Sequence, residues 1–391
     1  MNSRERIFAA LNHEEPDCIP YDLGGTHVTS IHVVAYRRLC AALGIDPEPV
    51  VFSDIVQQTV VPCDALMERF GVDTRGLFPG CSHNRGFETA TETEDAYEHV
   101  DEWGFAQRLA KKGGFWWSQV GFPIDGMTVD PKALAAYRWP VADDPSRIEG
   151  LRVLAREYRD AGKIVMCKSL CAGMFEMGQR FRRMDNFLCD LLADPKTAEM
   201  LMDGVLELKK RYWAMVLGEL GDLIDIVVEN DDYGTQESQL ISLRTYETLI
   251  RPRLEDLFRF IKETHVEKRA GGERGYLFFH SCGNVRPYLP GFIEMGVDIL
   301  NPVHVTADGM SPEDLKRDFG DTITFWGGGV ETQNILSRGT PEEVRGNVRR
   351  NVDALAPGGG FVFNTIHNIQ AEVPPENILA MWEEVWGNVE G

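Results

Sequence analysis

His280 and Cys282, two residues apart, are the side chains of this sequence with the clearest potential for chemistry. They follow the apolar run 276–279, which predicts a short buried strand, and Gly283-Asn284 predicts the turn that ends it. Side chains at positions i and i+2 of a strand can converge on one ion, and imidazole and thiolate are both preferred ligands of Zn²⁺. The pair therefore predicts half of a zinc site at the end of a strand. The alternative is that Cys282 is a small core residue.

The elements that would position this pair alternate between strand and helix from about residue 150. Apolar runs predict strands at 163–167, 225–229, 276–279, 298–301, 323–327 and 360–364. Helical patterns are found at 152–161, 195–220, 242–263, 288–295, 312–318, 341–354 and 375–387. A Rossmann-type sheet would need a glycine-rich turn after its first strand, and none is visible. We therefore predict an α/β fold, a (β/α)8 TIM barrel whose site lies at the C-terminal ends of the strands.

The first 150 residues are less regular. They hold an opening helical pattern, the loop 24–27, a strand that ends at Asp54, and a segment rich in Trp, Gly and acidic residues at 102–117. We expect an N-terminal extension and an insertion that covers the mouth of the barrel, within a single domain of residues 1–391. His27 is expected either to reach the site from its loop or to be structural.

Acidic side chains at two predicted strand ends are candidate catalytic groups. Asp54 could act directly, cap the next helix or orient a ligand. Glu229 and Asp232 end and follow the strand 225–229, and each is a candidate fourth metal ligand, partner of a ligand or general acid. We favour the role of ligand partner for both, because a working zinc site keeps one position open.

Aromatic and glycine residues near the predicted mouth are candidates for contact with a substrate or cofactor. Trp326 and Gly328, at the end of the strand 323–327, are predicted cofactor contacts. The run Gly327-Gly328-Gly329 could cradle a phosphate or simply allow close backbone approach, and no phosphate-binding motif follows it. The other aromatic candidates, for which core packing is the alternative, are Trp103, Phe115, Trp116 and Trp117.

Composition excludes several classes of function. The 391 residues are 43% hydrophobic and carry a net charge of -21, which repels phosphate backbones and anionic membrane surfaces. No apolar run approaches the roughly 20 residues of a membrane span, and the charged start is unlike a signal peptide. The eight cysteines have no disulfide-framework spacing. We expect a cytoplasmic protein that binds neither nucleic acid nor membrane.

Several stretches together resemble the uroporphyrinogen decarboxylase superfamily, which includes decarboxylases and zinc-dependent corrinoid methyltransferases. The stretches are 3–12, 17–20, 52–55, 231–236, 280–284 and 374–377. The resemblance runs from about residue 3 to residue 384, and it implies the same barrel and a homodimer.

The decarboxylases of this superfamily resemble this chain at one position and differ from it at another. Their arginine-rich segment, which binds the carboxylates of a tetrapyrrole, is replaced here by residues 22–27, and no arginine follows them until Arg37. That difference argues against uroporphyrinogen as the substrate. Asp54 matches the catalytic aspartate of the decarboxylases, which leaves a metal-independent decarboxylase-like lyase as an alternative.

The methyltransferase branch binds zinc through His-x-Cys and a distant cysteine, seven residues before the proline that matches Pro374. Here that position is His367, so the resemblance implies a zinc site of His280, Cys282 and His367. The alternative for His367 is a metal-free histidine, which the decarboxylases also have there. A site of two imidazoles and one thiolate leaves the zinc ion with more net positive charge than a site of one imidazole and two thiolates. The higher charge favours polarisation of a methoxy oxygen.

The resemblance implies methyl transfer between a small methylated substrate and the cobalt of a corrinoid. Since the chain has no D-x-H-x-x-G motif for cobalamin, we expect the corrinoid on a separate partner protein. A third hypothesis is a non-catalytic corrinoid- or tetrapyrrole-binding module.

Overall fold

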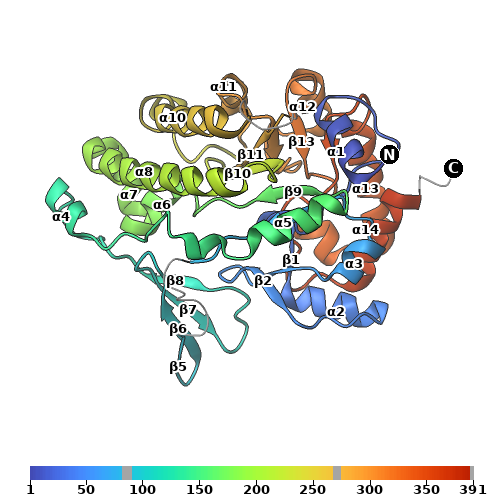
Figure 1. Cartoon of the computed structure of the whole chain (residues 1–391), viewed down its shortest axis with the longest axis horizontal. Helices are drawn as coiled ribbons and strands as arrows, with labels where there is room; N and C mark the ends of the chain where they lie inside the picture. The colour runs from blue at the N-terminus through green and yellow to red at the C-terminus, as the bar shows by residue number, and fades with distance from the viewer. Residues whose placement is uncertain (82–89, 267–273, 388–391) are drawn as a thin grey trace.

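The computed structural model describes residues 1–81, 90–266 and 274–387, with a parallel sheet at its centre (Figure 1). Seven strands pair side by side, each parallel to its neighbours. In spatial order they are β14 (Phe361–Val362), β13 (Thr324–Trp326), β12 (Ile299–Asn301), β11 (Tyr276–His280), β10 (Ile226–Asn230), β9 (Ile164–Cys167) and β4 (Thr74–Leu77).

The segment 20–22 closes this sheet into a barrel. Tyr21 forms a parallel bridge with Phe363, and the backbone N–H of Asp22 donates to the Phe363 carbonyl at 3.0 Å. On its other side, the Asp73 N–H donates to the Tyr21 carbonyl at 2.9 Å, just before β4. The segment 20–22 thus takes the position of an eighth strand between β14 and β4. The predicted (β/α)8 barrel is confirmed.

Helices surround the barrel because each carries an apolar stripe that the sheet buries. On α8 (Pro195–Leu220), for example, Leu201, Val205, Leu208 and Tyr212 are buried at helical spacing. The other helices of the barrel layer are α1 (Ser3–Leu11), α2 (Val33–Leu43), α3 (Asp64–Arg69), α5 (Leu151–Asp160), α6 (Met174–Arg182), α7 (Met184–Ala193), α9 (Leu243–Thr245), α10 (Arg251–Ile261), α11 (Leu289–Glu294), α12 (Pro312–Phe319), α13 (Pro341–Leu355) and α14 (Pro375–Gly387).

The predicted helix at 242–263 is divided into shorter pieces. The π-helical turns η4 (Tyr246–Ile250) and η5 (Lys262–Val266) flank α10. The predicted boundaries of α8 and α14 agree with the structure. Shorter turns are η1 (His27–Thr29), η3 (Pro145–Ile148), η6 (Arg286–Tyr288) and η7 (Thr332–Leu336). No helix in the described ranges is both long and apolar enough to span a membrane.

Successive side chains of a strand point alternately into the barrel and toward the helices, and this alternation decides which side chains reach the mouth. Ile226 and Val228 of β10, and Tyr276 and Phe278 of β11, belong to the apolar cluster inside the barrel, which α1 closes at the N-terminal end. The next inward positions are Asn230 and His280, the last residues of these strands. Polar residues therefore follow the apolar interior directly at the mouth.

The less regular N-terminal part forms two small antiparallel sheets. The first contains β1 (Ile31–His32), β3 (Thr59–Val61) and β2 (Val51–Asp54). The second lies at the lower left of Figure 1 and contains β5 (Thr91–Glu92), β6 (Ala96–Val100), β7 (Ala106–Ala110) and β8 (Ser118–Gly121). The helix α4 (Pro131–Ala136) follows the second sheet. These residues are the predicted extension and insertion.

Candidate metal centre and cavity

A cavity of about 320 Å³ lies at the C-terminal ends of the barrel strands. Barrel residues that line it include Lys168, Asn230 and His280, and Trp103 and Gln107 line it from the insertion. The insertion thus covers the mouth, as predicted. The volume lies at the small end of the range for ligand sites, so it suits a small molecule.

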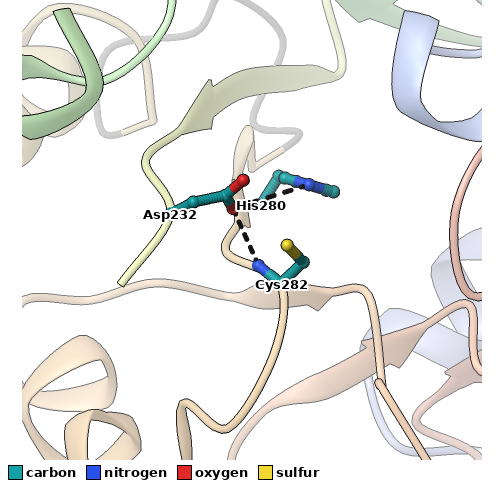
Figure 2. A group of neighbouring side chains, drawn as sticks. All are labelled: Asp232, His280 and Cys282. Atoms are coloured by element: carbon teal, nitrogen blue, oxygen red, sulfur yellow. Dashed lines mark hydrogen bonds and ion pairs between the residues drawn. The ribbon is translucent and has the colours of Figure 1, made fainter. Parts of the chain in front are cut away.

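Asp232 and His280 line this cavity, and Cys282 lies beside them, with one potential ligand atom of each of the three within 4.8 Å of the others (Figure 2). Oδ1 of Asp232 lies 3.9 Å from Nε2 of His280 and accepts a 2.9 Å hydrogen bond from the Cys282 backbone N–H. Imidazole, thiolate and carboxylate are all ligands that Zn²⁺ takes in proteins.

Asn301 orients the imidazole of His280. Its side-chain NH₂ donates to the Trp326 carbonyl at 2.7 Å, which turns Oδ1 toward Nδ1 of His280 at 2.5 Å. Because that oxygen can only accept, Nδ1 carries the proton and Nε2 keeps a free lone pair on the side of Asp232. Histidine ligands of metals are commonly held in this way. The tautomer therefore fits a metal ligand.

The thiol of Cys282 also fits a cation site. Burial, and after it the Asp232 carboxylate, raise the pKa of this thiol well above its usual value. A buried thiolate beside a carboxylate is an unfavourable pair of anions. A divalent cation between them would stabilise both charges, since thiols lose their proton when they coordinate zinc. The donor set thus suits Zn²⁺.

Two glycines let the loops that carry Asp232 and Cys282 approach closely. A Cβ added to Gly283 would lie 2.6 Å from the backbone of Gly234 and 2.6 Å from the Thr235 carbonyl oxygen. Gly283 also has a φ of 82°, which favours glycine. The backbone contact between these loops sets the distance between the two ligands.

We expect Gly283→Ala to weaken zinc binding at least about tenfold, because the loops must separate. Gly126→Ala is the control, since Gly126 has a φ of 69° but open space around its Cβ position. Both variants should lose about 1 kcal/mol of folding free energy from backbone strain. Competition with a chromogenic chelator measures the affinity. Equal zinc affinities in the two variants would contradict the importance of this contact.

His367 lies beside the metal group but outside it. Its ring centroid is 5.4 Å from that of His280, edge to face, and its Nδ1 is 3.0 Å from the Asn368 side-chain oxygen. Burial, with help from His280, lowers the pKa of His367 to about 4, so the ring is neutral near pH 7. The structure brings Asp232, rather than His367, within reach of both His280 and Cys282.

Asp54 lines the cavity as half of an ion pair. Its carboxylate is 2.8 Å from Nζ of Lys168 and also accepts the Gln57 backbone N–H at 2.9 Å. Burial alone would raise the pKa of Asp54, but the charge of Lys168 and its hydrogen bond outweigh this effect and hold the pKa well below the usual range. Asp54 is therefore an anion whose charge is balanced.

Glu229 does not face the cavity. It occupies an outward position of β10, where it pairs with Lys209 of α8 at 2.7 Å and accepts the Trp213 indole N–H at 2.6 Å. The prediction placed Glu229 at the mouth because it ends the apolar run, but strand alternation turns it toward the helices. Asn230 takes the inward position instead.

The predicted cofactor contacts Trp326 and Gly328 are not among the residues that line the cavity. Trp326 is fully buried in the barrel interior, where its indole N–H donates to Asp22 at 2.8 Å. Gly328 has a φ of 80°, and a Cβ added there would lie 2.7 Å from Cβ of Val303. Of the other aromatic candidates, Trp103 lines the cavity, Trp117 is buried elsewhere, and Phe115 and Trp116 are exposed.

Lys168 and Asn301 are site residues that the sequence reasoning missed. A signal existed for both, since each stands two positions after an apolar residue of the barrel interior, Met166 or Ile299. A polar residue at that offset from an inward-facing position should reach the mouth.

Comparison with known proteins agrees with this architecture. A methyltransferase from Methanosarcina mazei has a similar structure, with a TM-score of 0.64 at 17% identity, and 99% of each chain is covered. An endoxylanase of family GH10 from a sugarcane soil metagenome reaches a TM-score of only 0.36 at 8% identity, over 60% of this chain and 81% of that one. No curated protein sequence matches. Residues 151–387 match the family described as Uroporphyrinogen decarboxylase (URO-D). The chain therefore belongs to the URO-D family.

Proposed function

We propose that this protein is a zinc-dependent methyltransferase that moves a methyl group between a small methoxy substrate and the cobalt of a corrinoid on a partner protein. The observation that carries the proposal is the group of Asp232, His280 and Cys282 at a small cavity, with Nε2 of His280 free to coordinate. The structural similarity to a methyltransferase adds support.

His280, Cys282 and Asp232 would hold the zinc ion. When bound, Zn²⁺ supplies a Lewis acid that polarises the substrate oxygen from which the methyl group departs. With Asp232 in place of His367, the formal charge of the site is one lower than in the set predicted from the sequence. A carboxylate oxygen is a harder ligand than a second thiolate, so this set still favours a methoxy oxygen over a thiol.

The other side chains of the cavity would bind and orient the substrate. Trp103 offers an apolar surface for a small organic group. The ammonium group of Lys168 can donate a hydrogen bond to the departing oxygen, and Asp54 holds it in place at 2.8 Å. Asp54 is therefore assigned a positioning role. His367, with a neutral imidazole, is assigned to the wall beside the metal.

Decarboxylation through Asp54 is the second candidate, because Asp54 does line the cavity. The charges of the cavity argue against it. The two cations that line the described part of the cavity, Lys168 and Arg180, are already paired with Asp54 and Glu176. A substrate with several carboxylates would find no unpaired cation there.

Methyl transfer with and without zinc tests the proposal. The zinc-loaded protein, mixed with 2-methoxyphenol and a Co(I) corrinoid, should produce methylated corrinoid, which visible absorption detects. Removal of zinc by a chelator should lower the rate at least about 100-fold, and added zinc should restore it. An equal rate without zinc, or no transfer from any small methoxy compound, would contradict the proposal. Release of CO₂ from a carboxylated substrate by the metal-free protein would favour the second candidate.

A further inference from the structure

His27 is a buried imidazole that faces the cavity without a protein partner. Its side chain belongs to η1 and is 8% exposed, yet it lines the cavity. Neither ring nitrogen forms a hydrogen bond to any residue within the described ranges, and Nδ1 is buried. Because the buried Nδ1 has no surface open to the cavity, Nε2 is the ring nitrogen that a ligand there could reach. Polar groups of largely buried side chains are usually hydrogen-bonded, so an unpartnered Nε2 at a cavity points to a bound ligand as the partner.

The local fold holds this ring in place. The Thr26 side chain accepts the Thr29 backbone N–H at 3.2 Å, and the Thr29 side chain accepts the Thr26 N–H at 3.0 Å. The Gly25 N–H donates to Asp22 at 2.9 Å. His27 is therefore presented by a rigid turn, with no protein group placed to receive its hydrogen bonds.

His27 is also close to the groups assigned to the reaction. Burial, and after it the charge of Lys168, lower its pKa well below the usual value, and His280 and His367 act in the same direction. The ring is accordingly neutral, with one nitrogen that donates and one that accepts. Such a ring suits an oxygen atom of an uncharged molecule.

The charges around the cavity indicate the same class of ligand. Lys168 lies 2.8 Å from Asp54, and Arg180 lies 2.6 Å from Glu176. A zinc ion held by the Cys282 thiolate and the Asp232 carboxylate would also be neutralised. A carboxylate on the substrate would thus meet no unbalanced positive charge, and it would lose its hydration on entering.

We propose that His27 hydrogen-bonds an oxygen of the methyl donor, and that the donor is a small uncharged methoxy compound. This inference rests on the proposed methyltransferase function. His27 would touch the substrate from the side of the N-terminal turn, whereas His280 belongs to the metal group.

Calorimetric titration of the zinc-loaded protein tests the inference. The probes are 2-methoxyphenol, uncharged near pH 7, and its derivative with a carboxylate para to the hydroxyl. We expect the uncharged probe to bind at least about tenfold more tightly, because a carboxylate would be desolvated without a partner. His27→Ala should weaken binding of 2-methoxyphenol about five- to tenfold, and His27→Gln, which keeps a donor and an acceptor, should weaken it less.

His13→Gln is the matched control. His13 also has a buried Nδ1 without a partner, but it packs near Gly360 and does not line the cavity. Its substitution should leave the dissociation constant unchanged. Zinc content and thermal unfolding of the His27 variants should equal those of the wild type, which separates a lost contact from a damaged fold.

Nuclear magnetic resonance with ¹⁵N-labelled histidine gives a direct readout. The His27 ring signals, identified by their loss in His27→Gln, should shift when 2-methoxyphenol is added, and the His13 signals should not. Unshifted His27 signals, a His27→Ala dissociation constant within twofold of the wild type, no binding of 2-methoxyphenol, or tighter binding of the carboxylate would each overturn the inference. Because binding needs neither corrinoid nor turnover, failure of methyl transfer alone would count against the proposed function and not against His27.

Discussion

The alanine variant of Cys282 will lose both its zinc and its methyl transfer, at least about 1000-fold in rate, if this thiolate holds the metal. Its sulfur belongs to the group of ligand atoms with Asp232 and His280. Without it, only an imidazole and a carboxylate remain of that group. Elemental analysis of the purified protein should give about one zinc ion per chain for the wild type and almost none for Cys282→Ala.

Cys171→Ala is the matched control for this experiment. Cys171 is also partly buried and lines the cavity beside the metal group, but it lies outside that group. Its removal should leave zinc content unchanged and methyl transfer within about threefold of the wild type. Equal zinc loss in both cysteine variants would show that burial of a thiol, rather than coordination, explains the effect.

The same measurement decides between Asp232 and His367. We expect Asp232→Asn and His280→Ala to lose zinc, and His367→Ala to retain it, because the His367 ring lies outside the group. Asn301→Ala should weaken zinc binding about 10- to 100-fold through loss of its hydrogen bond to His280. Zinc lost in His367→Ala but kept in Asp232→Asn would instead support the ligand set implied by the family resemblance.

Replacement of Lys209 by methionine will cost about 3–5 kcal/mol of folding free energy, because it leaves the Glu229 carboxylate buried without its counter-charge. The Lys209 and Glu229 side chains are 0% and 2% exposed, and their charged atoms are 2.7 Å apart. Lys209 also donates to the Cys171 carbonyl at 3.2 Å. Urea unfolding measures the loss.

Arg152→Met provides the comparison at an exposed ion pair. Arg152 and Asp222 are 2.7 Å apart but 44% and 45% exposed, so water screens their attraction. That variant should lose at most about 1 kcal/mol. The double variant Lys209→Met/Glu229→Leu should recover most of the stability, since it removes the unpaired charge. If Lys209→Met cost no more than Arg152→Met, Glu229 would have another source of stabilisation, and its separation from the cavity would need revision.

The two acidic candidates at β10 show how far sequence reasoning could go. The apolar run 225–229 correctly predicted a buried strand, and its end correctly pointed to the barrel mouth. One residue of register, however, separates Asn230, which lines the cavity, from Glu229, which contacts α8. A run that is apolar on both faces carries no alternation from which that register could be read.

The insertion also shows what could not be predicted from the sequence. Four of its aromatic residues were predicted candidates for the cavity, namely Trp103, Phe115, Trp116 and Trp117, but only the folded structure decides which of them face inward. Trp103 lines the cavity, whereas Trp116, thirteen positions later by number, is 53% exposed. Trp103 lies in the connection between β6 and β7, and Trp116 lies in the connection between β7 and β8. The packing of this sheet against the barrel decides which connection meets the cavity, and the composition of the segment does not reveal it.

The sequence by itself determined the barrel and the pairing of His280 with Cys282, because strand–helix alternation and a two-residue spacing are local properties of the chain. Only the tertiary structure decided what surrounds that pair. Asp232 meets Cys282 across 50 positions, and Asn301 meets His280 across 21, because β10, β11 and β12 are neighbours in the sheet. Contacts between strands depend on order, register and the direction of each side chain, and these are fixed only when the barrel closes.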